Sequence, residues 1–278
     1  MKNLSNENIV HVKKNGVEYL QFKKLLEYSN IINHAYSLGL DNNFKVLDGK
    51  TGIYKGEKLE KTINSYKKLS EAIGSNYSHI VKPIQMHTKE VKCVKNKTTF
   101  SKEHVLFKEF DNTDGLITNM PEEMLSTTNA DCILLLFFDP IKKVIANTHS
   151  GWRGTLQRIS VKTVKKMIKE FNCKPEDIIC CICPSIRKCH FEVDKDVKDM
   201  FENEFKELTG FIEETIPNKK WHIDTVYINK EILKKAGLKP ENIVDSNICS
   251  VCNCEQIHSY RVEGVGNGLS TALIEIKG

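Results

Sequence analysis

The chain has 278 residues, of which 40% are hydrophobic, so it can bury a substantial core as one large domain or two small ones. Its net charge of +5 comes from 41 basic and 36 acidic residues, and the excess is spread over lysine pairs, which is typical of a solvated surface and not of a nucleic-acid interface. The first sixteen residues lack the apolar core of a signal peptide, and the longest strongly apolar run covers only residues 133–138. We therefore expect a cytoplasmic protein whose ten cysteines are thiols unless a metal holds them.

Short elements are predicted in the first hundred residues. They are strands at residues 19–22 and 31–37, a helix at about 58–73, and two segments, 78–84 and 91–94, that flank a turn at 85–88. No internal repeat and no low-complexity linker divides the chain. We expect a single domain over residues 30–278, with residues 1–29 as an N-terminal extension that packs on it.

The clearest element is a hairpin in the middle of the chain. Residues 132–138 and 143–149 have the composition of strands, and Asp139-Pro140-Ile141-Lys142 has that of a turn. With the turn centred between Pro140 and Ile141, Cys132 would lie directly opposite His149, with Cβ atoms about 4.5 to 5.5 Å apart. That separation suits two ligands of one metal ion.

The remaining elements interleave irregularly. A helix is predicted from near Thr155 to before Asn172, and a second helix over 197–208, whose apolar residues include Met200. A short third helix is predicted near 232–236 with Gly237 as its cap, and a strand at 270–276. This order predicts a mixed α+β fold in which helices flank the sheets.

The segment 148–155, Thr-His-Ser-Gly-Trp-Arg-Gly-Thr, combines a metal-ligand residue, a flexible turn and a fixed cation. His149 can bind a metal or a proton, Trp152 can stack on a flat substrate, and Arg153 beside the predicted helix start can bind an anion. Arg261, before a glycine-rich loop, could join Arg153 on that anion. The alternative is a tight turn and a surface loop in which these side chains satisfy neighbouring carbonyls.

A catalytic zinc ion keeps three protein ligands and one open position. Cys132 and His149 supply two ligands, and we choose His87, in the turn after Gln85, as the third. Asp131 or Asp114 would act as a base or orient a ligand, unless each caps backbone amides. A cysteine and a histidine on one hairpin could instead be a nucleophile and its base without a metal.

Other cysteines also resemble metal clusters, but the 69 residues between Cys180 and Cys249 argue against an ordinary zinc ribbon. These cysteines are Cys180, Cys181, Cys183, Cys189, Cys249, Cys252 and Cys254. His190-Phe191-Glu192 followed by Cys249-x-x-Cys252 imitates a nucleobase deaminase signature, but no proline precedes Cys249. We expect no zinc at either group.

Seven motifs occur in a fixed order over about residues 30–276. They are Gln85-Met86-His87, Thr113-Asp114-Gly115-Leu116-Ile117-Thr118, Ala130-Asp131-Cys132, His149-Ser150-Gly151-Trp152-Arg153-Gly154, Phe191-Glu192-Val193, Ile223-Asp224 and Ser259-Tyr260-Arg261. In this order they resemble the laccase-domain proteins, also called the multicopper polyphenol oxidase or YfiH-like family.

The resemblance implies an α+β domain with zinc on residues matching His87, Cys132 and His149. It also implies purine nucleoside phosphorylase activity on adenosine, inosine or guanosine, with methylthioadenosine phosphorolysis and adenosine deamination as side activities. Copper is not expected, because a multicopper oxidase needs about ten His and Cys ligands in His-x-His patterns. This chain has nine histidines and no His-x-His.

On this hypothesis Arg153 and Arg261 hold phosphate, Asp131 orients the reactants or accepts protons, and Gln85 and Trp152 bind the substrate. Val262 and Asn267 stand where the family commonly has arginine, so fewer cations should surround the phosphate. We expect a nucleoside and phosphate as partners, neither nucleic acid nor membrane, and we allow for a homodimer. The rival functions are an amide hydrolase that edits peptidoglycan precursors with the same Cys and His, and a non-catalytic zinc-binding module.

Overall fold

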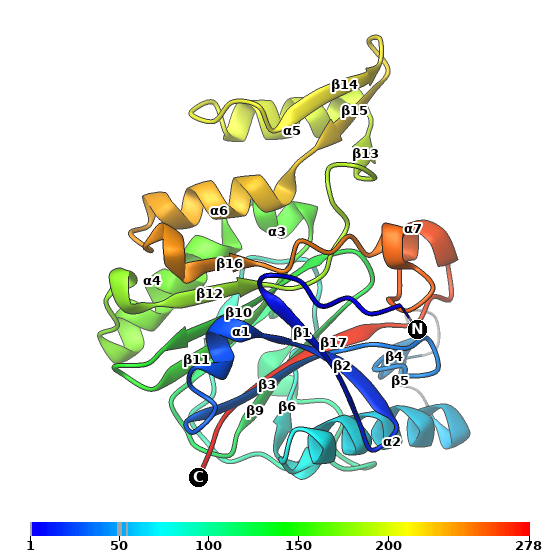
Figure 1. Ribbon diagram of the computed structural model, residues 1–278, viewed down its shortest axis with the longest axis vertical. Coiled ribbons are helices and arrows are strands. Elements are labelled where there is room, and N and C mark those ends of the chain that lie inside the picture. Colours follow the sequence, from blue (N-terminus) through cyan, green and yellow to red (C-terminus); the bar gives the residue numbers. More distant parts are fainter. Residues whose placement is uncertain (1, 49–51, 54) are drawn as a thin grey trace.

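The computed structural model describes residues 2–48, 52–53 and 55–278. Two six-stranded sheets lie face to face, and helices cover their outer faces (Figure 1). One large apolar cluster connects the sheets and contains Leu134 and Phe138 of one sheet and Leu125 and Ile274 of the other. This arrangement confirms the predicted α+β class.

The first sheet has the strand order β1-β2-β3-β17-β9-β6. Its strands are β1 (Ile9–Lys14), β2 (Val17–Phe22), β3 (Ile32–Ser37), β17 (Ser270–Ile276), β9 (Met124–Asn129) and β6 (Ile80–Val81). Helix α2 (Gly56–Ala72) covers this sheet with buried residues such as Tyr66 and Leu69. The predicted strands at 19–22, 31–37 and 270–276 and the helix at 58–73 are confirmed, whereas β1, a mostly half-buried strand at the edge of the sheet, was not predicted.

The second sheet has the order β16-β12-β10-β11-β8-β7 and carries the candidate site. Its strands are β16 (Ile243–Asp245), β12 (Ile179–Ile182), β10 (Ile133–Asp139), β11 (Val144–Ser150), β8 (Gly115–Thr118) and β7 (Val91–Cys93). Helices α4 (Ile159–Phe171) and α6 (Thr225–Lys235) pack on its outer face. Strand β10 is buried on both faces, which explains its uninterrupted apolar run.

A smaller unit protrudes at the top of Figure 1. It consists of β13 (Glu192–Val193), α5 (Lys195–Glu204), β14 (Ile212–Ile216) and β15 (Lys220–Ile223), around buried Phe201 and Phe205. The remaining elements are short: α1 (Lys23–Leu26), β4 (Leu47–Asp48), β5 (Gly52–Ile53), α3 (Trp152–Leu156), α7 (Tyr260–Glu263) and five single 3₁₀ turns. Met200, one of the apolar residues that indicated the helix over 197–208, is 48% exposed on α5.

The predicted hairpin exists, but its predicted register was wrong. Leu134, and not Cys132, lies opposite His149. The loop is centred one residue later than predicted, because the Asp139 carboxylate accepts the N–H groups of Ile141 and Lys142, each at 2.9 Å, and Lys143 takes a left-handed conformation. Cys132 therefore precedes β10 and reaches the site from the loop.

The helix predicted from near Thr155 is divided in two. Helix α3 already begins at Trp152, and Arg158, with a φ of 56°, separates it from α4. The Arg158 guanidinium binds Glu204 and Glu207, which stabilises the break. Arg153 consequently lies within the first turn of a short helix and not before it.

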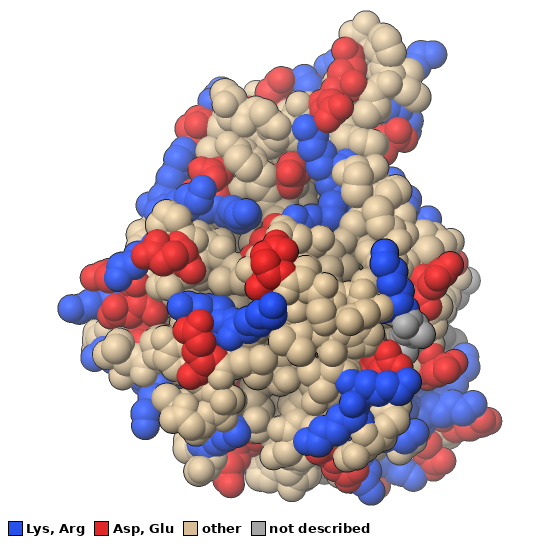
Figure 2. Space-filling view, in the orientation of Figure 1, with Lys and Arg blue, Asp and Glu red and all other residues tan. Residues whose placement is uncertain are grey.

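The surface visible in Figure 2 carries Lys and Arg side chains interspersed with Asp and Glu. Many of these charges form ion pairs between neighbouring turns, such as Lys61 with Glu57 and Lys198 with Glu202. Among the described residues, no helix has the length and apolar character needed to cross a membrane.

Candidate metal centre and its two cavities

Three predicted ligands meet at one end of the second sheet. His87 comes from the turn between β6 and β7, Cys132 from the loop before β10, and His149 from β11. The Cys132 sulfur lies 3.8 Å from Nε2 of His87, and the two imidazole rings meet edge to face with centroids 4.9 Å apart. All three ligand atoms lie within 4.8 Å of one another. The two imidazoles and one thiolate therefore fit a single ion and leave a coordination position open.

Asp114, on the segment entering β8, holds both histidines. Its carboxylate accepts the Nδ1–H of His149 at 2.8 Å, which leaves Nε2 of that ring for a metal. The same carboxylate accepts the backbone N–H groups of Met86, His87 and Thr88. Of the roles open to Asp114, the structure thus shows orientation of a ligand together with amide capping.

The ligands approach one another through unusual backbone positions. His87 has a φ of 58°, in the left-handed region that non-glycine residues rarely adopt. Gly151 packs against this ring, so that a Cβ atom there would lie 2.6 Å from Cδ2 of His87 and 3.2 Å from the Cys132 sulfur. Residue 151 must therefore lack a side chain for His87 and Cys132 to approach the same point.

The electrostatics of the cluster favour a thiolate. Burial opposes ionisation of Cys132, but the neighbouring imidazoles of His149 and His87 outweigh burial and lower the thiol pKa to about 6. Burial also disfavours a charged His149, yet the Cys132 thiolate and the Asp114 carboxylate raise its pKa to about 9. A thiolate is the form of cysteine that binds metals, and an incoming cation would displace the imidazolium proton.

One cavity next to the cluster, which we call the lysine cavity, has a volume of about 260 Å³. Lys45, Lys82, Gln85 and Asn267 line it together with all three candidate ligands. Burial lowers the pKa of the Lys82 ammonium to about 8. No carboxylate in the described part of the chain lies within 4.0 Å of this ammonium.

Sequence reasoning missed both lysines of this cavity. Lys82 is a lone cation within the apolar stretch 80–84, and this signal could have identified it. Lys45 lies some forty residues away in the sequence and had no such signal. Gln85, predicted to bind substrate, lines the cavity, while its amide is already engaged with the backbone N–H and C=O of Thr128.

A second cavity, the arginine cavity, has a volume of about 520 Å³ and shares His87, Ala130 and Cys132 with the first. Trp152, Phe191 and Tyr260 supply aromatic surface, and Arg153 and Arg261 supply cations. The Arg153 guanidinium lies 4.1 Å from the centre of the Trp152 ring. The structure thus brings the two predicted anion-binding arginines to one cavity.

Asp131 also lines the arginine cavity, and both of its oxygens accept hydrogen bonds. One oxygen accepts the Ser250 hydroxyl and the other the backbone N–H of Arg261. Asp131 has a φ of 86° and directly precedes Cys132. It therefore connects the ligand loop to the segment that carries Arg261.

The sequence profile of the family described as multi-copper polyphenol oxidoreductase laccase matches residues 43–277. The chain belongs to this family. Its two metal-ligand clusters among the described residues, with three and four donors, are too small for a multicopper centre despite the family's description.

Curated relatives of this family member carry the name of an enzyme. Purine nucleoside phosphorylase LACC1 of Homo sapiens is 32% identical over 174 residues, which are 61% of this chain but only 40% of that protein. Purine nucleoside phosphorylase of Bacteroides thetaiotaomicron is 27% identical over 215 residues, 77% of this chain and 80% of the relative. The crystal structure of Bacillus licheniformis hypothetical protein YfiH superposes with a TM-score of 0.82 at 22% identity, over 98% of this chain and 100% of that one, which shows the shared fold.

Proposed function

We propose that this protein is a zinc-dependent purine nucleoside phosphorylase. The observation that carries the proposal is that two residues of the three-ligand cluster, His87 and Cys132, line both cavities, and that the arginine cavity combines aromatic surface with two guanidinium groups. Relatives that bear the name purine nucleoside phosphorylase support it. The aromatic side chains of this cavity would bind a nucleoside, and its guanidinium groups would bind an anion.

His87, Cys132 and His149 would hold the ion, with Asp114 fixing the tautomer of His149. When bound, zinc would supply a Lewis acid at the wall between the cavities. Asp114 also holds the strained backbone of His87, so the donor set is pre-organised by the protein.

The arginine cavity would hold the reactants. Trp152, Phe191 and Tyr260 offer faces on which a purine ring can stack. Arg153 and Arg261 supply forked donors for the oxygens of phosphate. The Arg261 guanidinium is positioned by its bonds to the carbonyl groups of His190 at 2.9 Å and Glu192 at 3.2 Å.

In phosphorolysis a phosphate oxygen forms a bond to C1′ of the ribose while the C1′–N9 bond breaks. The electron pair of that bond leaves with the purine, which takes up a proton. Arg153 and Arg261 would align the phosphate and offset its charge. Asp131, which binds the backbone N–H of Arg261, would orient this arrangement or accept a proton from the reactants.

Two other reactions fit the same residues. Deamination of adenosine would place water instead of phosphate at the cluster, as a side activity. Hydrolysis of an amide would use Cys132 as the nucleophile, and the low pKa of its thiol favours this second candidate. The three reactions differ in their co-substrate and products.

Product analysis with adenosine separates the two nucleoside reactions, and an enzyme that hydrolyses only amides would leave adenosine unchanged. Phosphorolysis yields adenine and ribose 1-phosphate only when phosphate is present, whereas deamination yields inosine without phosphate. We expect the Cys132→Ala variant to lose the zinc ion of this cluster and phosphorolysis together, and Cys93→Ala, a half-buried cysteine outside the cluster, to keep both. Full zinc content and full phosphorolysis in Cys132→Ala would exclude the proposal.

A further inference from the structure

A second group of donors lies outside the candidate active site, at the exposed side of the loops that follow β12 and β16. It consists of Cys189, His190, Cys249 and Cys252, whose ligand atoms all lie within 4.8 Å of one another. The Cys189 sulfur is 3.7 Å from that of Cys249 and 4.0 Å from that of Cys252. Nδ1 of His190 lies 3.2, 3.7 and 3.6 Å from the sulfurs of Cys189, Cys249 and Cys252.

These separations match the edges of a tetrahedron around one ion. With Zn–S bonds of about 2.3 Å and a Zn–N bond of about 2.0 Å, tetrahedral zinc holds its sulfurs about 3.8 Å apart and a sulfur and nitrogen about 3.6 Å apart. A disulfide would instead require two sulfurs about 2.05 Å apart, and all three cysteines are free thiols. The side chains are thus arranged for coordination and not for a bridge.

The separation in sequence, which argued against a metal cluster at these cysteines, does not keep the four donors apart in the fold. Strands β12 and β16 pair in parallel, so the segments that follow them leave the sheet side by side. An isolated bridge between Ser185 and Cys249 continues this pairing beyond the strands. Cys180, Cys181 and Cys183 are buried and lie outside the cluster, so the relevant spacing runs from Cys189-His190 to Cys249-x-x-Cys252.

We propose that Cys189, His190, Cys249 and Cys252 form a second zinc site, with a structural role. Three thiolates and one imidazole occupy all four tetrahedral positions, which leaves none for a substrate. Two ligands come from adjacent residues and two from a Cys-x-x-Cys segment, so the ion closes a loop between distant parts of the chain. Metal binding therefore stabilises the fold locally, because the loops must come together to bind it.

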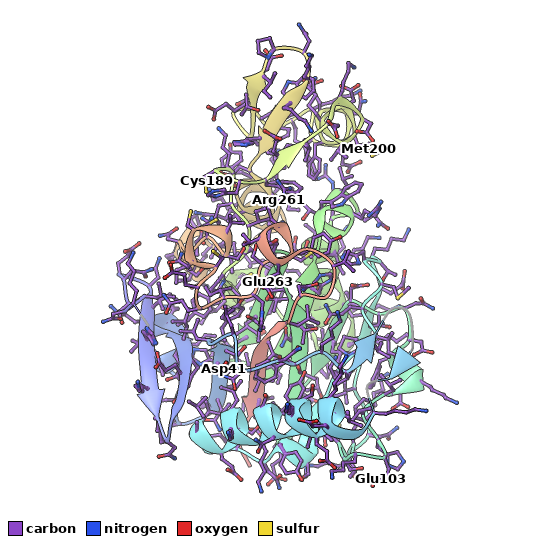
Figure 3. The ribbon with its side chains drawn as sticks, turned by 90° about the vertical axis from the view of Figure 1, so that its right-hand side faces the viewer. Asp41, Glu103, Cys189, Met200, Arg261 and Glu263 are labelled. Carbon is purple, nitrogen blue, oxygen red and sulfur yellow. The ribbon has the colours of Figure 1, made fainter. Side chains whose placement is uncertain are left out.

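The site stands directly behind the arginine cavity. Figure 3 shows Cys189 close to Arg261, below the protruding unit that contains Met200. The carbonyl of His190, one of the four ligand residues, accepts a hydrogen bond from the Arg261 guanidinium, and Ser250, between the other two, donates to Asp131. The second zinc thus fixes the cavity wall that carries Arg261 without touching the reactants.

Metal analysis of the full chain, purified with a reductant, tests the proposal independently of any activity. We expect two zinc ions per chain in the natural protein and one in Cys252→Ser, which replaces an exposed ligand. The matched control is Cys254→Ser, two residues further along the same segment and outside the cluster, which should retain two. The loss of one ion from Cys252→Ser relative to the natural protein carries the assignment, so equal zinc contents in these two proteins, or the loss of an ion from Cys254→Ser, would overturn it.

Cobalt substitution provides a second measurement that keeps the new site intact. The His87→Ala/His149→Ala variant removes two ligands of the candidate active site, so its remaining cobalt should show the absorption of tetrahedral coordination. Its thiolate-to-metal band should be more intense than that of the single-thiolate site left in Cys252→Ser, because three thiolates bind the ion instead of one. A band of single-thiolate intensity in this variant would exclude the site. Failure of the proposed phosphorolysis would change neither measurement.

Discussion

The carboxylate of Asp114 bonds at the same time to the imidazole of His149, at 2.8 Å, and to the backbone N–H of His87, at 3.0 Å. One side chain therefore sets both the orientation of a histidine ring and the conformation of the turn that presents the other histidine. We expect the Asp114→Asn variant to place an amide N–H₂ against at least one of these donors. Its affinity for zinc should fall about 10- to 100-fold, as measured by competition with a chelator.

The control for this prediction is Asp111→Asn, which changes an exposed carboxylate three residues earlier in the same loop. Its zinc affinity should equal that of the natural protein. Equal affinities in Asp114→Asn and Asp111→Asn would contradict the role of Asp114.

Gly151 permits a close approach of His87, and a methyl group at this position should prevent it. In Gly151→Ala the added Cβ would meet Cδ2 of His87 at 2.6 Å, so the ring must move away from Cys132. We expect zinc affinity to fall by about tenfold or more. Gly154→Ala in the same motif is the matched control, because its Cβ would meet the end of the Ile159 side chain at 3.3 Å and no residue of the cluster. Tight zinc binding by Gly151→Ala, measured by the same competition, would show that the cluster does not need this contact.

Arg153 is predicted to bind phosphate and not the nucleoside alone. In Arg153→Met the loss of a charge-assisted contact should raise the KM for phosphate about 10- to 100-fold, with a smaller change in the KM for the nucleoside. Arg153→Lys should recover only part of this loss, because an ammonium cannot bind two oxygens as a fork. Lys165→Met on the exposed side of α4 removes the same charge outside both cavities and should leave both constants unchanged. A rise in the nucleoside KM alone would assign Arg153 to the other reactant.

Glu275, on β17, should make the fold less stable as the pH rises. Burial and the neighbouring Glu122 carboxylate raise its pKa to about 7, against the opposing hydrogen bond from Asn33, whereas in the unfolded chain it should be near 4.5. The folded protein therefore binds the extra proton between these values, and the free energy of unfolding falls as the pH rises from about 4.5 to 7. Glu275→Gln should remove this loss.

At pH 8 the Glu275→Gln variant should be more stable than the natural protein by about 1–2 kcal/mol, and at pH 4 the two should be nearly equal. Thermal unfolding across this pH range measures the difference. Glu255→Gln, an exposed site, should follow the natural protein at every pH. A stability gain for Glu275→Gln that does not vary with pH would point to packing instead of ionisation.

The candidate site could be predicted from sequence where its residues follow local patterns. The apolar runs of β10 and β11 identified the hairpin, although not its register, which depends on how the Asp139 side chain caps the loop. His87 could be chosen as a ligand, but its meeting with Cys132 depends on the path of the chain through two sheets. Lys45 had no local signal, since a lysine near a cavity looks like any surface lysine in the sequence.

The four donors of the second cluster are distant in sequence and close in space, so spacing alone could not predict that they meet. Spacing rules for zinc sites assume that one continuous segment folds around the ion, whereas here a parallel strand pair aligns two segments. The sequence contains all four donor residues, but it does not show that the two segments that carry them lie side by side. The break between α3 and α4 could not be predicted for the same reason, because it depends on ion pairs of Arg158 with two glutamates of a later segment.

The hairpin of β10 and β11 places its two ends in very different surroundings. Cys132 and His149 lie at the open end, while the loop at residues 140–143 lies seven strand residues away, roughly 23 Å along the sheet. Ile141 at its tip is 69% exposed. A fluorophore, an affinity tag or a surface anchor attached at this loop would therefore leave the metal centre and both cavities free, which makes it a suitable handle for measuring binding in the intact protein.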